Sequence, residues 1–274
     1  MDFKGKTVII TGGSEGVGRA TAHAFADAGA NLVLAARTRK NLEEVAEELR
    51  DKTRVEIFAM DVADTVACSN LLKKAQFEFG SVHVLVNNAG YHQRGPVLTV
   101  DSGDLAAMID VNLRGPIVLS RLAIPMIKEA GEGAIINVAS LAGRTPVPGA
   151  ATYSASKFGM RAFTFALAEE LRDTNIKVAA VSPGPIDTGF IMANIDNVTD
   201  LTFSQPISTA EEVAQEILNL CSNNKLERSM PPLSGLLTMA IYLWPAIGRV
   251  MRPMFEKKGQ RVKRKLKVQR LEDK

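Results

Sequence analysis

The sequence predicts a doubly wound α/β fold, in which one parallel sheet carries helices on both faces. Three observations lead to this class. Short apolar runs rich in β-branched residues alternate along the chain with longer segments of helical periodicity. The apolar runs lack polar alternation, as is typical of strands covered on both faces. With 274 residues, 46% of them hydrophobic, the chain is long enough to bury one large core.

The elements follow one another in strand–helix order. The β-branched runs predict strands over 6–11, 31–37, 54–61, 83–88, 133–140 and 177–184. The helical spacing between them predicts helices over 18–29, 40–51, 64–79, 101–130, 151–172 and 209–223. The fourth helix should break near Gly115–Pro116, because proline cannot continue the helical hydrogen bonding. We therefore predict a single parallel-sheet domain over 1–225 and an appendage over 226–274.

The basic residues gather at the carboxyl end of the chain. Residues 249–274 contain 11 Lys/Arg and 3 Asp/Glu, a balance of +8, so a chain of net charge +3 carries −5 elsewhere. We therefore expect no nucleic-acid partner. Cys68 and Cys221 fit neither a disulfide framework nor metal-ligand spacing, which predicts a reducing compartment and no metal site. With no signal-peptide pattern before the first strand, we expect a cytoplasmic protein.

A glycine-rich turn, TGGSEGVG (11–18), joins the first strand to the first helix. Gly12, Gly16 and Gly18 allow a tight turn and let the backbone approach a ligand closely. The helix that follows offers free N–H groups and the positive end of its dipole to a pyrophosphate. The turn therefore predicts dinucleotide binding, with these residues around the phosphates: Gly12, Ser14, Glu15, Gly16 and Val17.

The end of the second strand, LAARTRK, predicts which nicotinamide cofactor is used. A carboxylate there would bind a ribose 2′-hydroxyl, whereas an arginine accommodates a 2′-phosphate. Ala35 and Ala36 stand where the acid would be, and Arg37 follows. A guanidinium can grip the phosphate with two hydrogen bonds, so we predict NADP(H). Two observations leave room for NAD(H): Glu15 lies in the glycine turn, and the basic residues could form an ordinary solvated turn.

Tyr153 and Lys157 lie four positions apart in ATYSASKFG, so on a helix they share one face. A free phenol has a pKa of about 10 and is a poor base at neutral pH. A neighbouring ammonium favours the phenolate and lowers that pKa. The pair therefore predicts a proton-transfer site, although a packed tyrosine beside a surface lysine would give the same pattern.

Taken together with other motifs, the pair resembles the classical short-chain dehydrogenase/reductase family. The family's TGxxxGxG turn corresponds to residues 11–18, its YxxxK pair to Tyr153 and Lys157, and its PGxxxT element to 183–188. The resemblance extends in order over about residues 5–225. It implies a Rossmann-type fold and a catalytic set of Asn112, Ser140, Tyr153 and Lys157.

The resemblance also implies a role for each of these residues. Tyr153 is expected to exchange the proton with the carbonyl oxygen, and Ser140 to polarise that oxygen. Lys157 is expected to lower the pKa of Tyr153 and to bind the nicotinamide ribose, and Asn112 to position a water for proton resupply. The implied cofactor contacts are Asp61 and Val62 at the adenine, Asn88, Ala89 and Gly90 at its ribose, and Pro183, Gly184, Ile186 and Thr188 at the nicotinamide. Homo-oligomers, dimers or tetramers, are expected through helices 101–130 and 151–172.

The appendage departs from that family pattern. Residues 229–248 carry no charge, and apolar residues recur at helical spacing from Leu233 to Phe255, with Ser234 and Thr238 off the apolar face. A basic tail follows: Lys257, Lys258, Arg261, Lys263, Arg264, Lys265, Lys267 and Arg270. An interfacial helix on anionic lipid, with peripheral membrane contact over 229–270, fits this pattern. Packing on the body or a partner subunit, and a true membrane span, remain alternatives.

The function predicted from these features is an NADP(H)-dependent oxidoreductase that transfers hydride between nicotinamide and a carbonyl or secondary alcohol. The appendage resembles those of lipid-ketone reductases such as 3-ketosphinganine reductase-like members, so we expect a hydrophobic or lipid-like substrate. One alternative is a soluble reductase of 3-oxoacyl thioesters or small ketones. Another is a non-catalytic NADP-sensing or scaffold protein, against which the intact catalytic set argues. His92 and Gln93 are candidates for the border of the substrate entrance.

Overall fold

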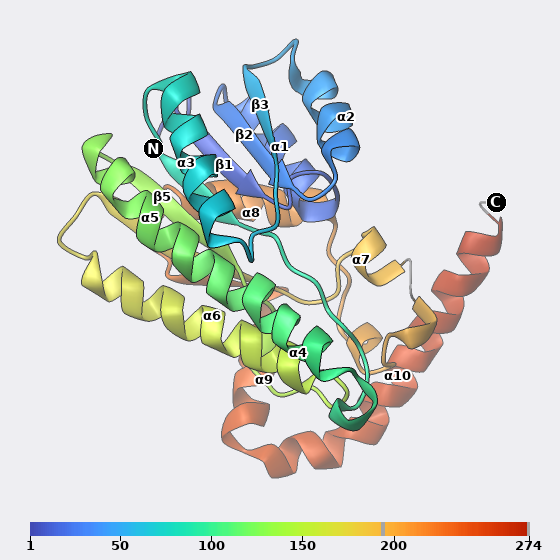
Figure 1. Ribbon diagram of the computed structural model, residues 1–274. Helices are drawn as coiled ribbons and strands as arrows, with labels where there is room; N and C mark the ends of the chain where they lie inside the picture. The colour runs from blue at the N-terminus through green and yellow to red at the C-terminus, as the bar shows by residue number, and fades with distance from the viewer. Residues whose placement is uncertain (193–194, 273–274) are drawn as a thin grey trace.

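Seven parallel strands form one sheet in the order β3-β2-β1-β4-β5-β6-β7 (Figure 1). This computed structural model describes residues 1–192 and 195–272. The strands are β1 Thr7–Thr11, β2 Asn31–Ala36, β3 Val55–Ala59, β4 Val84–Asn87, β5 Gly133–Val138, β6 Ile176–Pro183 and β7 Glu227–Met230. The strand order reverses between β1 and β4, which is where open α/β sheets bind their ligands. The predicted Rossmann-type fold is confirmed.

Helices cover both faces of this sheet. They are α1 Gly16–Asp27, α2 Arg39–Leu49, α3 Thr65–Phe79, α4 Ser102–Ile109, α5 Gly115–Glu129, α6 Ala151–Glu170, α7 Gly189–Met192, α8 Ala210–Leu220, α9 Pro232–Leu243 and α10 Pro245–Glu272. Neighbouring residues of β1 show how the core divides. Val8 and Ile10 pack in one apolar cluster with α1, α2 and α8, whereas Ile9 packs in the other with α3, α5 and α6. Both faces of β1 are buried, which explains the unbroken apolar run in the sequence.

The helix predicted over 101–130 is interrupted earlier than expected. A π-helical turn, Asp110–Arg114, separates α4 from α5. It lies immediately before Gly115–Pro116, where the sequence predicted the break. Gly115 starts α5 against the loop after β3, where a β-carbon would lie 2.5 Å from the Val62 carbonyl oxygen. The π-helical turn contains Asn112, and such turns are frequent at functional sites.

The chain beyond residue 225 begins with a strand that the sequence did not predict. Its four residues, ERSM, show neither a β-branched run nor alternation, yet β7 pairs with β6 along the edge of the sheet. Two helices follow it and lie below the carboxyl ends of the strands in Figure 1. Among residues 1–192 and 195–272, no helix combines the length and hydropathy needed to cross a bilayer.

The sequence left open whether the apolar side of α9 faces lipid, the body or a partner, and in this structure much of that side is exposed. Ser234, Gly235 and Thr238 are its buried residues, while Leu233 and Leu236 are exposed. The small side chains let α9 approach β7 closely. α10 packs instead through Val262 and Leu266 against an apolar cluster that includes Phe203. The side chain of Arg270 lies outside the described part of the chain.

Candidate active site

The carboxyl ends of the central strands open on a cavity of about 730 Å³. All of the predicted cofactor-binding residues line it: Gly12, Ser14, Glu15, Gly16, Val17, Arg37, Asp61, Val62, Asn88, Ala89, Gly90, Tyr153, Lys157, Pro183, Gly184, Ile186 and Thr188. Ser140 lines it as well. Asn112 does not, because it is fully buried behind the cavity wall.

The glycine turn is shaped for close contact with a ligand and with the neighbouring loop. Gly12 has a φ of +64°, and a β-carbon there would lie 2.8 Å from Asn88 Nδ2. A β-carbon on Gly18 would lie 1.9 Å from the Gly12 carbonyl oxygen, so only glycine fits. Glu15 precedes α1 without capping its N–H groups by its side chain. These amides remain free for phosphate oxygens, and the turn therefore fits a dinucleotide.

Arg37 directly follows β2 and is an exposed residue of the cavity lining. Its neighbours in the sequence are engaged on α2, where Arg39 pairs with Glu43 at 3.3 Å and Lys40 with Glu44 at 4.0 Å. Arg37 makes no ion pair within the described residues. Of Arg37, Arg39 and Lys40, Arg37 is thus the residue whose charge is available to bind an anion.

Lys157 lies one turn after Tyr153 on α6, and its Nζ is 5.8 Å from the centre of the phenol ring. The ammonium is buried and donates a hydrogen bond of 2.8 Å to the Val138 carbonyl oxygen. Burial lowers the pKa of Lys157 to about 8. The two side chains share one side of the helix, as the spacing predicted.

The acidity of Tyr153 differs from the sequence expectation. Its pKa lies above the ordinary value, because burial disfavours the phenolate more than the Ser140 hydroxyl and the positive charge of Arg94 favour it. Arg94 thus adds a positive charge near the phenol that the sequence did not predict. Ser140 accepts a hydrogen bond of 3.1 Å from the Ala142 N–H, which holds its hydroxyl at the end of β5.

Asn112 supports the loop after β4 from behind. Its Oδ1 accepts from the Tyr91 N–H, and its Nδ2 donates to the Tyr91 carbonyl oxygen, both at 2.9 Å. Between Asn112 and the cavity lies Gly90, where a β-carbon would be 2.9 Å from Asn112 Oδ1 and 3.6 Å from Lys157 Nζ. The side chain of Asn112 therefore fixes this loop and lies close to the lysine.

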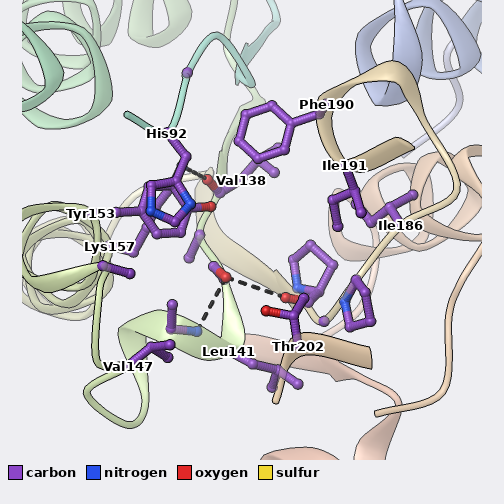
Figure 2. Close-up of a pocket in the computed structure, with 18 of the residues that line it drawn as sticks. His92, Val138, Leu141, Val147, Tyr153, Lys157, Ile186, Phe190, Ile191 and Thr202 are labelled. Atoms are coloured by element: carbon purple, nitrogen blue, oxygen red, sulfur yellow. Dashed lines mark hydrogen bonds between the residues drawn. The ribbon is translucent and has the colours of Figure 1, made fainter. Parts of the chain in front are cut away.

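His92 and Gln93 of that loop were predicted to border the substrate entrance. The ring of His92 stacks on Tyr153, with centroids 4.2 Å apart and planes at 13° (Figure 2). Burial lowers the pKa of His92 to about 3, helped by Arg94. His92 thus borders the cavity as the sequence suggested, whereas Gln93 is exposed and does not line it.

Arg94 is the site residue that sequence reasoning missed. It is partly buried, lines the cavity and lies 5.9 Å from the centre of the Phe190 ring. Its one hydrogen bond is a long one, 3.5 Å, to the Phe190 carbonyl oxygen, and no carboxylate pairs with it within the described residues. Its place after the carboxyl end of β4 was the only signal, since one loop arginine has no motif of its own.

Apolar residues from distant segments close the cavity on the side of Tyr153. Leu141 and Val147 follow β5, and Phe190 belongs to α7 (Figure 2). The C-terminal helices complete this wall with Leu237, Ile241, Tyr242 and Phe255. α9 and α10 are therefore part of the site.

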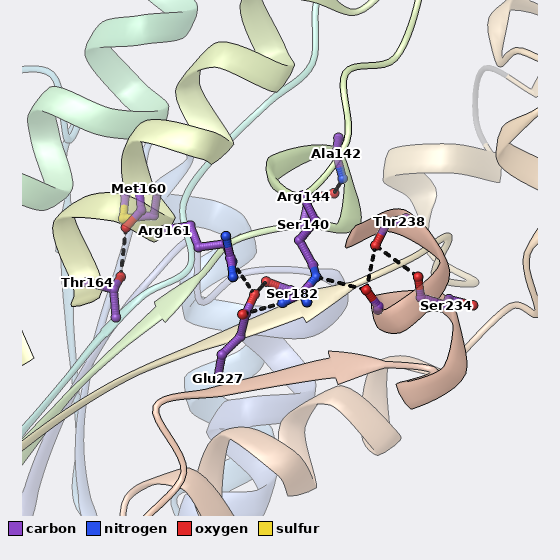
Figure 3. Close-up of polar contacts among 11 residues, drawn as sticks. Ser140, Ala142, Arg144, Met160, Arg161, Thr164, Ser182, Glu227, Ser234 and Thr238 are labelled. Carbon is purple, nitrogen blue, oxygen red and sulfur yellow. Dashed lines mark hydrogen bonds and ion pairs between the residues drawn. The ribbon is translucent and has the colours of Figure 1, made fainter. Parts of the chain in front are cut away.

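A largely buried ion cluster fixes α9 to the body (Figure 3). Glu227 on β7 accepts hydrogen bonds from Arg144, from Arg161 Nε at 2.8 Å and from Ser182 Oγ at 2.7 Å. Although burial opposes it, these partners lower the pKa of Glu227. Arg144 also donates to the Gly235 carbonyl oxygen at 3.3 Å. The cluster thus connects α6, the loop after Ser140 and α9.

Comparison with known proteins identifies the family. A family model described as short chain dehydrogenase matches residues 6–198. The chain is 40% identical over 187 residues to sulfoacetaldehyde reductase 2 of Chromohalobacter salexigens, covering 68% of this chain and 74% of that protein. It is 35% identical over 225 residues to an NADP-dependent 3-hydroxy acid dehydrogenase of Schizosaccharomyces pombe, covering 78% and 86%.

A third relative is the 3-oxoacyl-(acyl-carrier-protein) reductase FabG of Thermotoga maritima, 32% identical over 228 residues, which cover 81% of this chain and 93% of that protein. These relatives are named as reductases or dehydrogenases of carbonyl or hydroxyl compounds, and the region that the family model matches contains the glycine turn and the Tyr153–Lys157 pair. The chain belongs to the short-chain dehydrogenase family and is an oxidoreductase that transfers hydride between a nicotinamide cofactor and a carbonyl or alcohol carbon.

Proposed function

We propose that this oxidoreductase uses NADP(H) and reduces a carbonyl group in a hydrophobic, lipid-like molecule. The observation that supports this substrate class is the apolar wall beside Tyr153, to which α9 and α10 contribute Leu237, Ile241 and Phe255. Binding sites for small molecules are typically apolar, with a few polar groups that fix orientation. Here the polar groups are those of the catalytic set.

In the proposed mechanism the bound nicotinamide supplies the hydride. Tyr153 donates its proton to the carbonyl oxygen, and the Ser140 hydroxyl donates a hydrogen bond to that same oxygen. The raised pKa of Tyr153 keeps the phenol protonated at neutral pH, which is the form that reduction requires. Lys157 orients the cofactor and passes on the replacement proton, while Asn112 holds the loop that flanks it.

Arg37 supports the choice of NADP(H). A guanidinium free of protein partners at this edge of the cavity can bind a 2′-phosphate with two hydrogen bonds. Replacing it in Arg37→Asp should reduce the preference for NADPH over NADH by about 10²-fold, since a charge-assisted pair is lost and a repulsive charge is introduced. Binding titrations with both cofactors measure the ratio, and an unchanged ratio would contradict the assignment.

Arg94 favours a second candidate, a small carbonyl substrate that carries an anion. A partly buried guanidinium without a carboxylate partner is costly unless a ligand supplies one. Two of the relatives are named for sulfoacetaldehyde and for 3-hydroxy acids, both of which are anionic. The soluble small-ketone or 3-oxoacyl-thioester alternative therefore stays open.

A substrate panel followed by NADPH absorbance separates the two candidates. Long-chain apolar ketones are compared with sulfoacetaldehyde and short 3-oxo acids, for the wild type and for Arg94→Met. We expect the apolar ketones to have the higher kcat/KM, and Arg94→Met to lower kcat/KM several-fold more for the anionic substrates than for the apolar ketones, because its effect on Tyr153 is common to both. Tyr153→Phe should lower kcat about 10²–10⁴-fold for every active substrate. Turnover that is unchanged in Tyr153→Phe would contradict the catalytic assignment. No turnover of any substrate by the wild type would favour the scaffold interpretation.

A further inference from the structure

We propose that the outward side of α9 and α10 docks on an anionic lipid bilayer. Its apolar part, which we call the elbow patch, spans both helices. Leu236 there is 69% exposed and Val250 is 80% exposed. Single exposed apolar residues are normal, but a group this large marks a site of contact with another apolar phase. The elbow patch comprises Leu233, Leu236, Leu243, Trp244, Ile247, Val250 and Met254.

Along α10 the same side changes from apolar to basic. Val250, Met254, Lys257, Arg261 and Arg264 follow one another at spacings of four, three, four and three residues, which places them in one row along the helix. Five exposed cations in or next to this row, which we call the basic row, form no ion pair within the described residues. They are Lys257, Lys258, Arg261, Arg264 and Lys265.

The opposite side of α10 is fixed to the body, so the basic row cannot turn inward. A β-carbon on Gly259 would lie 1.7 Å from the Asp200 carbonyl oxygen, which shows how closely the helix approaches. Lys263 donates a hydrogen bond of 2.6 Å to the Val198 carbonyl oxygen and pairs with Asp200 at 3.7 Å, and Lys267 pairs with Asp196. The cations of the inner side are thus neutralised, whereas those of the basic row remain available.

An anionic bilayer fits this arrangement better than a second copy of the chain. An apolar surface beside unpaired cations suits shallow insertion, with the cations among acidic headgroups. A two-fold contact through the elbow patch would instead bring two basic rows toward each other, and the acidic residue exposed nearby on α10, Glu256, is already paired with Arg252 at 2.7 Å.

Docking would also bring the bilayer close to the cavity. Leu237, Ile241 and Phe255 line the cavity from the same two helices that carry the elbow patch. Only the thickness of these helices would separate the lipid from the substrate site, so an apolar substrate could pass from one to the other. This consequence rests on the proposed function, whereas the docking itself does not.

Sedimentation of the full-length protein with vesicles tests the docking without any measurement of activity. We expect binding to phosphatidylcholine vesicles containing about one-third phosphatidylserine to be at least tenfold tighter than to pure phosphatidylcholine, and to weaken with salt. Trp244 is the only tryptophan of the chain and lies in the elbow patch, so its emission should shift to the blue on binding.

Two matched triple variants separate the basic row from net charge. Lys257→Glu with Arg261→Glu and Arg264→Glu should weaken binding to the anionic vesicles by at least about tenfold. Lys4→Glu with Lys73→Glu and Lys225→Glu makes the same charge change at exposed sites elsewhere and should leave binding nearly unchanged. Equal losses in both variants, or wild-type binding that ignores phosphatidylserine, would overturn the proposal. A dimer interface at the elbow patch would also overturn the proposal. It would appear as unchanged Trp244 emission with vesicles, together with a dimer, detected by light scattering, that dissociates when Leu236→Ser and Val250→Ser are introduced.

Discussion

Two helices of nearly equal length flank β7, and they bury opposite kinds of residue. α8 buries Val213, Ala214, Ile217 and Leu220, and its Glu211 and Glu212 are exposed. α9 buries Ser234, Gly235 and Thr238 and exposes Leu233, Leu236 and Leu243, while Leu237 lines the cavity. The core of the protein therefore completes α8 but not α9. A helix that packs on the body through its polar side leaves its apolar side available for contact with another molecule or with lipid.

The largest effect expected from this comparison concerns the attachment of α9. Glu227→Gln would leave two buried guanidinium groups without their carboxylate, at a cost of about 3–5 kcal/mol in the free energy of unfolding. Urea denaturation measures the loss. Glu216→Gln on α8 is the matched control, because its partner Arg228 is partly exposed and 3.6 Å away, and it should cost about 0–1 kcal/mol. Similar losses in both variants would show that α9 is not held by this cluster.

Truncating one apolar residue on each helix tests the difference directly. Ile217→Ala on α8 creates a cavity in the core and should cost about 2–5 kcal/mol. Leu236→Ala on α9 removes an exposed side chain and should change stability by no more than about 0.5 kcal/mol. Thermal and urea unfolding give both values. A large loss for Leu236→Ala would mean that the elbow patch is covered in solution, as in a contact between subunits.

The catalytic core also contains a buried charge that should make stability depend on pH. The pKa of Lys157 is about 8 in the folded protein and 10.5 ordinarily, so between these values the unfolded chain holds a proton that the folded chain has lost. Stability should therefore rise with pH through this window. Relative to Lys157→Met, the wild type should gain roughly 3 kcal/mol between pH 7.5 and 10.5. Parallel stability–pH profiles for the two proteins would show that folding does not lower the pKa of Lys157.

The contrast between α8 and α9 also shows how far the sequence alone could lead. Wherever apolar periodicity and burial agree, as in β1 and α8, the predicted elements are confirmed with small shifts at their ends. The nucleotide turn and the Tyr153–Lys157 pair follow local spacing, so their place in the cavity could be predicted. Arg94 and β7 could not, because a single loop arginine and a four-residue edge strand depend on tertiary contacts for their position.

The sequence left the orientation of α9 open, since its apolar side could face lipid, the body or a partner, and Gly235 is the residue that decides it. A β-carbon at this position would lie 2.4 Å from both Cβ and Oγ of Ser229 on β7, and Cβ cannot withdraw because it is fixed to the strand. Gly235→Ala should therefore push α9 away from the sheet and cost about 1–3 kcal/mol.

Ser229→Gly should restore most of that loss in the double variant, because it removes the atoms that clash, and a double-mutant cycle from urea denaturation measures the coupling. Full additivity, or an alanine tolerated at no cost, would mean that α9 does not rest on β7 through its small residues. The apolar residues would then be free to turn toward the body, and the difference between the two helices would disappear.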